Sequence, residues 1–245
     1  MIIPIGDDNR DRRTTPYVTY LFIAVNILVF VFLQGLGRNV EFTYSLSTVP
    51  EEILTGRDLV TEGRIMQDLR SGREFRQPGL GPTPISVYIT LITSMFMHGG
   101  FAHILGNMLY LFIFGDNIED RIGHGRYAVF YLLTGVLASL AHVFTTAALD
   151  GNTMVPSLGA SGAISAVLGA YLVLFPKKRV YVILLRFVTA VPAVVAIGIW
   201  IVFQLLRGVG SLGGGTGVAY AAHIGGFIAG LALIKRFEPG RRPSR

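Results

Sequence analysis

Four polar side chains with catalytic chemistry lie inside otherwise apolar segments of this chain: Ser161, His223, His103 and Asn107. Polar groups inside a membrane are costly and often mark a function. A serine hydroxyl becomes a nucleophile when a base such as histidine accepts its proton. Asn107 and the amide of a helix-initial Ser161 would donate to the oxyanion that forms during acyl transfer. The residue types therefore indicate nucleophilic catalysis by a serine-histidine pair.

The heights of these side chains along their helices agree. At a rise of 1.5 Å per residue, Ser161 and His103 lie about 24 Å above the cytoplasmic ends of their helices, and His223 and Asn107 about 18 Å above them. His103 and Asn107 are four residues apart, so they project from one side of a helix. We therefore expect the four side chains to share one layer below the external surface.

Small residues accompany both members of the pair. Ala219, His223, Gly226 and Gly230 fall on one stripe of a helix. The segment around Ser161 has a matching surface of Gly159, Ala160, Gly162, Ala163, Ala166, Gly169 and Ala170. Small residues let membrane helices approach closely. The close approach of these two helices would bring Ser161 to His223.

Each of these residues, taken alone, also has a purely structural interpretation. A serine on a Gly/Ala face more often packs against a neighbouring helix than acts as a nucleophile. A single buried histidine is more often a hydrogen-bonded core residue than a catalytic base. His142 lies at a similar height, about 22 Å, so depth alone admits it as a rival base. No carboxylate or thiol joins His98 and His103, and we expect neither a metal nor a cofactor. His98 is expected to support the loop 97–100 or to bond the backbone near the site.

The elements that must position these residues are membrane helices. Of 245 residues, 51% are hydrophobic and only 15% are charged, where a soluble domain carries about 25% charged residues. The chain has no cysteine, which excludes disulfides and thiol catalysis. Its net charge of +6 is explained by the membrane loops and does not require nucleic acid.

Hydropathy predicts an all-helical membrane protein of six spans in a single domain. The expected spans are Tyr17 to Leu36, His103 to Ile118, Tyr127 to Leu149, Gly159 to Phe175, a fifth within Phe187 to Leu206, and Val218 to Phe237. The first is expected to be a retained anchor, because no Ala-x-Ala cleavage site follows it.

Basic residues predict the orientation, because short cytoplasmic connections collect Lys and Arg. They cluster after the second, fourth and sixth spans, for example at 177–179 and 235–236. Residues 1–16 and the tail 238–245 are therefore expected in the cytoplasm. Arg186 is expected to reach the cytoplasmic surface by snorkelling.

The connection over residues 38–102 is expected to be external. Within it, residues 85–97 are apolar but too short to cross a bilayer, which predicts a re-entrant or interfacial element. The Gly-rich link 208–217 is expected to give the fifth span freedom to open. Trp200 and Phe203 in that span either gate access from lipid or pack against it.

The motifs resemble those of the rhomboid intramembrane serine proteases over about Ser94 to Ile234. The residues that carry the resemblance are Gly159-Ala160-Ser161-Gly162, then Ala222-His223-Ile224-Gly225-Gly226 with Gly230, preceded by His98, His103 and Asn107. The resemblance implies a dyad in which Ser161 is the nucleophile and His223 the general base. It also implies that His103, Asn107 and the Ser161 amide line the oxyanion hole, with Gly159 beside it.

Two positions depart from the family pattern. The segment 86–97 lacks the Trp-Arg pair of many rhomboids, and Ser165 stands where many have an aromatic ring stacked on the catalytic histidine. No acidic residue in the layer orients His223, so packing or a weaker hydrogen bond must hold its ring.

The resemblance implies that single-span membrane proteins are the substrates, with lipid as the other partner. A bacterial or archaeal cell membrane is expected, because the chain is compact and shows no targeting extension. Two further readings are a noncatalytic rhomboid-like protein that binds membrane helices and a small transporter with a histidine proton relay. A transporter should show paired intramembrane acids or broken helices in corresponding halves, which the sequence lacks.

Overall fold

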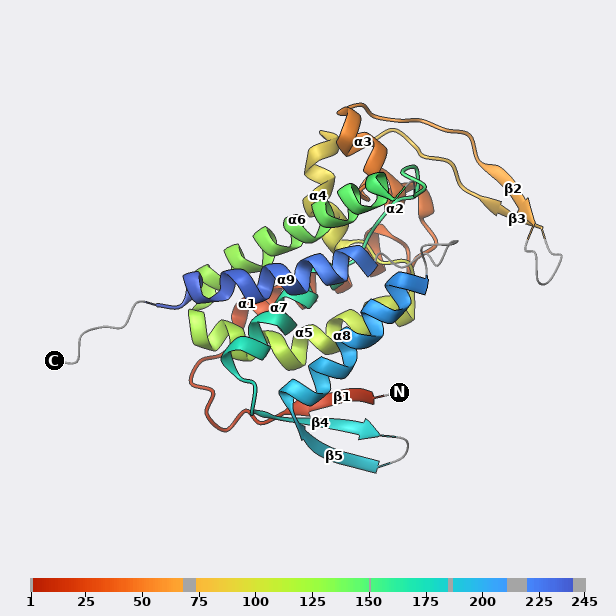
Figure 1. The fold of residues 1–245 in the computed structure, drawn as a ribbon. Helices are drawn as coiled ribbons and strands as arrows, with labels where there is room; N and C mark the ends of the chain where they lie inside the picture. The colour runs from red at the N-terminus through yellow and green to blue at the C-terminus, as the bar shows by residue number, and fades with distance from the viewer. Residues whose placement is uncertain (1, 68–73, 150, 185–186, 211–219, 240–245) are drawn as a thin grey trace.

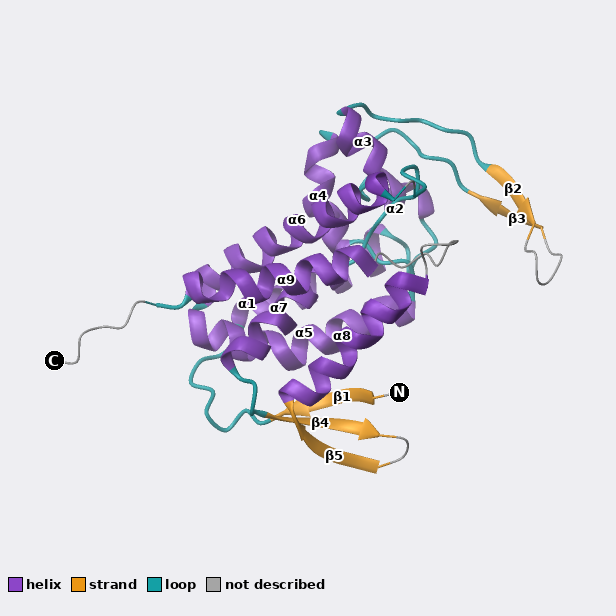
Figure 2. Ribbon diagram, viewed as in Figure 1, coloured by secondary structure: helices purple, strands orange, loops and turns teal. Residues whose placement is uncertain are grey.

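The computed structural model of the chain describes residues 2–67, 74–149, 151–184, 187–210 and 220–239 and is mostly helical (Figures 1 and 2). The helices are α1 (Tyr17–Leu28, continued by a π-helical turn, Val29–Leu33), α2 (Val40–Ser45), α3 (Pro50–Thr55), α4 (Thr90–Thr93, between 3₁₀ turns Val87–Ile89 and Ser94–Phe96), α5 (Phe101–Ile122), α6 (His124–Ala148), α7 (Ser161–Leu174), α8 (Ala193–Gly210) and α9 (Tyr220–Phe237). The strands are β1 (Ile2–Asp7), β2 (Arg64–Gln67), β3 (Glu74–Gln77), β4 (Arg179–Leu184) and β5 (Phe187–Pro192).

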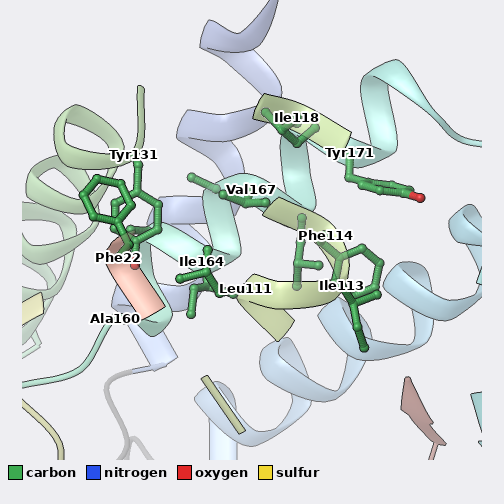
Figure 3. Packing of buried hydrophobic residues seen from close by; sticks show 14 of the residues in the cluster. Phe22, Leu111, Ile113, Phe114, Ile118, Tyr131, Ala160, Ile164, Val167 and Tyr171 are labelled. Atoms are coloured by element: carbon green, nitrogen blue, oxygen red, sulfur yellow. The ribbon is translucent and has the colours of Figure 1, made fainter. Parts of the chain in front are cut away.

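Helix α7 is the centre of the bundle. Its residues from Gly162 to Tyr171 are all buried, because α5, α6 and α9 pack around it. Figure 3 shows Leu111 and Phe114 of α5 beside Ile164 and Val167 of α7 in one apolar core. The helix that begins with Ser161 is therefore held on several sides.

The expectation of an all-helical protein was wrong, because the chain also forms two small sheets. Strand β4 pairs antiparallel with both β1 and β5, and β2 pairs with β3. The three-stranded sheet lies beside the N-terminal end of α8, and the β2–β3 hairpin projects away from the bundle (Figure 1). In β4, buried Val180 and Val182 alternate with exposed Arg179 and half-exposed Tyr181, as a sheet with one covered face requires.

The fifth span was expected within Phe187 to Leu206, and the helix found there begins later than that segment does. Residues 187–192 are strand β5, and helix α8 begins only at Ala193. Proline lacks the amide hydrogen of a helix interior and disfavours helical backbone in the residue before it. Pro192 therefore separates β5 from α8, although the whole segment is apolar.

The structure does not reproduce six separate full-length spans. Within the described residues, one helix (His124–Ala148) alone has the length and hydropathy to cross a membrane, and the pair Val87–Phe96 and Phe101–Ile122, bent by 81°, passes the same test together. Tyr17–Leu33, Ser161–Leu174 and Ala193–Gly208 are shorter apolar helices. At 1.5 Å per residue, α7 is about 21 Å long, less than a bilayer core of about 30 Å.

Glu119 fastens the first helix to the bundle. Its buried carboxylate accepts hydrogen bonds from the backbone amides of Val18 and Thr19, at 2.8 and 2.7 Å, and from the Thr19 hydroxyl. These amides belong to the first turn of α1, and Pro16 before it supplies no side-chain cap. A distant carboxylate therefore satisfies amides that the local sequence leaves free.

The long connection between α1 and α5 is folded against the segment that leads into α7. Thr48 and Ser157 form a two-way backbone bridge, and the amide of Glu51 donates to the carbonyl of Thr153. Residues 87–96 form short helices there, at the place of the expected re-entrant element. The connection thus restrains the approach to Ser161.

Several expectations fall outside the described residues. They concern Arg186, the Gly-rich link over residues 211–217, the start of the sixth span at Val218 and Ala219, and residues 240–245 of the tail.

Candidate active site

Ser161 is the first residue of α7, and the turn before it requires glycine. Gly159 has φ of +122°, a conformation that L side chains rarely adopt. A Cβ atom there would lie 2.7 Å from Nε2 of His103. The amide of Gly159 donates to the carbonyl of Ser94 at 2.8 Å. The turn therefore presents Ser161 at a helix N-terminus, where the dipole favours negative charge.

His223, on α9, meets Ser161 directly. Its Nε2 lies 2.7 Å from Oγ of Ser161, although the two residues are 62 positions apart. For Nε2 to accept the serine proton, the ring must carry its hydrogen on Nδ1. This is the geometry of a nucleophile with its base.

Glycines bring α7 and α9 into backbone contact. A Cβ on Gly226 would lie 2.1 Å from the carbonyl oxygen of Gly162, and one on Gly230 would lie 2.0 Å from that of Ala166. A Cβ on Gly169 of α7 would lie 2.4 Å from the carbonyl oxygen of Phe227. Since only glycine permits this approach, the small-residue surfaces position His223 against Ser161.

His103 and Asn107 lie on α5, and His103 reaches the turn that precedes Ser161. Nδ1 of His103 accepts a hydrogen bond from the Gly99 amide at 3.3 Å. The ring hydrogen therefore belongs on Nε2, the atom that faces Gly159. His103 can thus donate a hydrogen bond beside Ser161.

His98 contacts both Asn107 and His103. It is fully buried, its Nε2 lies 2.9 Å from Nδ2 of Asn107, and its ring packs edge-on against His103 with centroids 5.1 Å apart. Gln34 holds the backbone of His98 at both its amide and its carbonyl, at 3.0 and 2.9 Å. The sequence indicated a supporting role but not Gln34, which lies far away in the chain.

Gln204, like Gln34, is a residue of the site that the sequence did not indicate. Its Oε1 lies 2.9 Å from Nδ1 of His223. Trp200, one turn earlier on α8, lies against the same ring, with centroids 6.2 Å apart. A signal was present, because Trp200 and Gln204 are four residues apart and share a helix face. Ser165 does not contact the ring but donates to the Ser161 carbonyl at 2.6 Å.

A cavity of 540 Å³ opens beside the dyad between α5 and α8. Tyr110 and Phe114 line it from α5, and Trp200, Phe203 and Gln204 line it from α8, with His223 also at its wall. The cavity is mainly apolar and reaches His223, which suits an apolar peptide segment.

His142 does not enter the serine-histidine contact. Its ring nitrogen Nδ1 lies 3.5 Å from the hydroxyl of Thr146, one turn along the same helix. The described residues include no group of three or more His, Asp or Glu side chains that could hold a metal.

Comparison with known proteins agrees with the motifs. A family model described as the rhomboid domain matches residues 86–237. Rhomboid protein 1, mitochondrial, of Saccharomyces cerevisiae is 33% identical over 148 residues, 58% of this chain and 40% of its own length. Rhomboid protease GluP of Bacillus subtilis is 28% identical over 220 residues, 89% of this chain and 35% of its own. RHOMBOID-like protein 5 of Arabidopsis thaliana is 34% identical over 144 residues, 58% and 42% of the two chains.

The chain spans less than half the length of these three relatives. Several relatives are named as mitochondrial, so the comparisons do not support the expectation of a bacterial or archaeal cell membrane. That expectation rested on the compactness of the chain, which is a property of the fold and does not identify the organism. Because the matched domain covers more than half of the residues and contains every motif residue discussed above, the chain belongs to the membrane-embedded rhomboid family.

Proposed function

We propose that the protein is an intramembrane serine endopeptidase that hydrolyses peptide bonds in or near the transmembrane segments of membrane proteins. Ser161 is the nucleophile and His223 the general base. The observation that carries this proposal is the 2.7 Å contact between Oγ of Ser161 and Nε2 of His223.

The reaction follows from this geometry. Nε2 of His223 takes the proton of Ser161 as Oγ attacks the substrate carbonyl, and the carbonyl oxygen becomes an oxyanion. The Ser161 amide, His103 and Asn107 donate to that oxyanion. His223 then gives its proton to the leaving amine as the peptide bond breaks. A water molecule, activated by His223, releases the acyl group and restores Ser161.

The substrate must approach from the lipid and lose its helical structure locally. A transmembrane helix uses its carbonyls in internal hydrogen bonds, which shield them from attack. The apolar cavity between α5 and α8 would receive an unwound segment beside the dyad. We therefore propose single-span proteins with helix-destabilising residues near the cut as the substrate class. The distribution of Lys and Arg supports cytoplasmic termini and a cut near the opposite surface.

The noncatalytic reading rests on relatives named only as rhomboid-like, such as RHOMBOID-like protein 5. A protein that only binds membrane helices does not need a histidine in contact with its serine. The serine-histidine contact and the likeness to a protein named as a protease favour hydrolysis.

The direct test is cleavage of reporter single-span substrates by the full chain in liposomes. The panel carries Gly or Pro near the external end of the reporter helix, with a matched all-Leu helix as control. We expect a cut in the destabilised helices, located by mass spectrometry, and none in the all-Leu helix. Retention of every reporter without any cut would move the noncatalytic reading ahead.

Replacing Asn107 with alanine tests the oxyanion site. We expect kcat for the best reporter to fall about 10²- to 10³-fold with little change in KM, because the donated hydrogen bond strengthens only in the transition state. Asn26→Ala is the control, since Asn26 is also buried but bonds the Phe22 carbonyl of its own helix. Equal kcat values in the wild type and Asn107→Ala would remove Asn107 from the oxyanion site.

A further inference from the structure

The general base needs a partner on the side of its ring that faces away from the serine. Nε2 of His223 accepts from Ser161 only when the ring hydrogen sits on Nδ1, and a buried N–H requires an acceptor. In serine proteases with an acidic third member, a carboxylate selects this tautomer. No carboxylate of the described residues is hydrogen-bonded to His223, whose ring nitrogens contact Ser161 and Gln204.

Gln204 has the chemistry to select the productive tautomer. The atom that faces Nδ1 at 2.9 Å is its amide oxygen, which only accepts. The opposite amide orientation would donate to Nδ1, place the ring hydrogen on Nε2, and block proton transfer from Ser161. The orientation of the Gln204 amide therefore matches the tautomer in which His223 can accept from Ser161.

Trp200 restrains the same ring. It lies one turn before Gln204 on α8, with its ring tilted by 39° to that of His223. Ser165 leaves the α7 side of the imidazole without the aromatic ring that many rhomboids place there. Among the described residues, the rings beside His223 are Trp200 of α8 and Tyr220 of α9, with centroids 6.2 and 6.3 Å away.

We propose that Gln204 is the positioning residue of the general base, holding His223 in the tautomer and orientation that accept the proton of Ser161. This proposal rests on the proposed hydrolytic function.

The position of Gln204 also links base orientation to the cavity. Gln204, Trp200 and His223 all line the space of 540 Å³ between α5 and α8. Helix α9 is fixed to α7 by backbone contact at Gly226 and Gly230. Helix α8, in contrast, forms one wall of the cavity. A substrate segment in the cavity therefore lies against the residues that orient the base.

The test compares two variants of nearly equal size. Gln204→Met keeps the volume of the side chain and removes the acceptor, and Gln204→Glu keeps an acceptor. Leu205→Met is the control on the same helix, because Leu205 is exposed and does not line the cavity. Two rates are measured: reporter cleavage in liposomes, and acylation of Ser161 by a small fluorophosphonate that needs no transmembrane segment.

We expect Gln204→Met to lower kcat and the rate of fluorophosphonate labelling by about 10- to 100-fold, with KM nearly unchanged, because a misoriented base forfeits most of its general-base contribution. Gln204→Glu should recover most of the labelling rate at high pH. Leu205→Met should label at the wild-type rate. Thermal unfolding in detergent identifies any variant that has lost its fold.

The pH profile separates positioning from packing. Besides residue 204, the described titratable groups that face His223 or share its cavity are His103, His142, Tyr110, Tyr220 and Arg207. None of them changes in Gln204→Glu, and the new carboxylate stabilises the protonated imidazole. The acidic limb of the labelling rate should therefore move to higher pH in Gln204→Glu. A residue that merely packs would leave this limb in place.

The outcomes distinguish the two proposals. Wild-type protein that neither labels at Ser161 nor cuts any reporter contradicts the proposed function itself. Wild-type protein that labels, together with a folded Gln204→Met that labels equally fast, overturns the positioning role and leaves the hydrolytic function standing.

Discussion

Alanine in place of Ser161 is expected to reduce reporter cleavage by about 10⁶-fold, which in practice means to the background of the assay. The change removes the atom that attacks the substrate carbonyl, and it leaves the fold intact, because Oγ of Ser161 bonds His223 and supports no helix. Substrate capture should persist, since the cavity walls are unchanged. The measurement is the initial rate of cleavage in liposomes, with fluorophosphonate labelling in parallel.

Ser165→Ala is the matched control for this experiment. Ser165 lies one turn further along α7, is buried, and donates to the backbone carbonyl of Ser161 at 2.6 Å. Its loss removes a hydrogen bond within the helix and no reacting atom, so both cleavage and labelling should persist. If Ser161→Ala cut the reporter at the wild-type rate, the nucleophile would have to be another residue.

Of the substitutions discussed, Gly230→Ala is expected to lower the free energy of unfolding most. The new Cβ would lie 2.0 Å from the carbonyl oxygen of Ala166 and 2.7 Å from its Cα, and backbone atoms inside a helix cannot move aside as a side chain can. The two helices must separate, which should lower the free energy of unfolding by about 3 kcal/mol. Thermal unfolding in detergent measures this loss.

The same substitution should impair catalysis, although Gly230 touches no reacting group. Gly230 lies seven residues after His223 on α9, about two helical turns away. Separation of α9 from α7 displaces His223 from Ser161, and a displacement of about 1 Å is enough to reduce the rate about 10²-fold. Fluorophosphonate labelling at a temperature where the variant is still folded reports this effect.

Gly198→Ala provides the control for helix composition. No heavy atom lies within 4 Å of a Cβ built on Gly198 of α8. Alanine is favoured over glycine inside a helix by up to about 1 kcal/mol, so this variant should be as stable as the wild type or more so. Equal stability of Gly230→Ala and Gly198→Ala would mean that α7 and α9 are not in backbone contact.

Much of the candidate site could be predicted because its signals are local. The spacing of His103 and Asn107 puts them on one helix face, and the rise of a helix gives the height of each polar residue. The glycines around Ser161 and His223 indicated which helices approach each other. The structure places Ser161 and His223 in contact, and the comparisons confirm the family.

The residues that support the site from distant segments, Gln204 and Gln34, could not be predicted in this way. Gln204 sits in an apolar segment where a single amide carries little signal, and its importance depends on which face of α8 meets α9. Gln34 holds the backbone of His98 from 64 positions away. Contacts between distant segments depend on packing angles that no local pattern encodes.

What the sequence by itself determined is the kind of membrane protein, its family and the residues that carry the proposed chemistry, because helical period, small-residue stripes and motif order are local properties of the chain. Only the tertiary structure decided that residues 2–7 form a strand with 180–184, that α8 begins after Pro192, and that Gln204 meets the base. Strand pairing and helix rotation are settled by which surfaces bury one another, so they emerge only when the whole bundle is assembled.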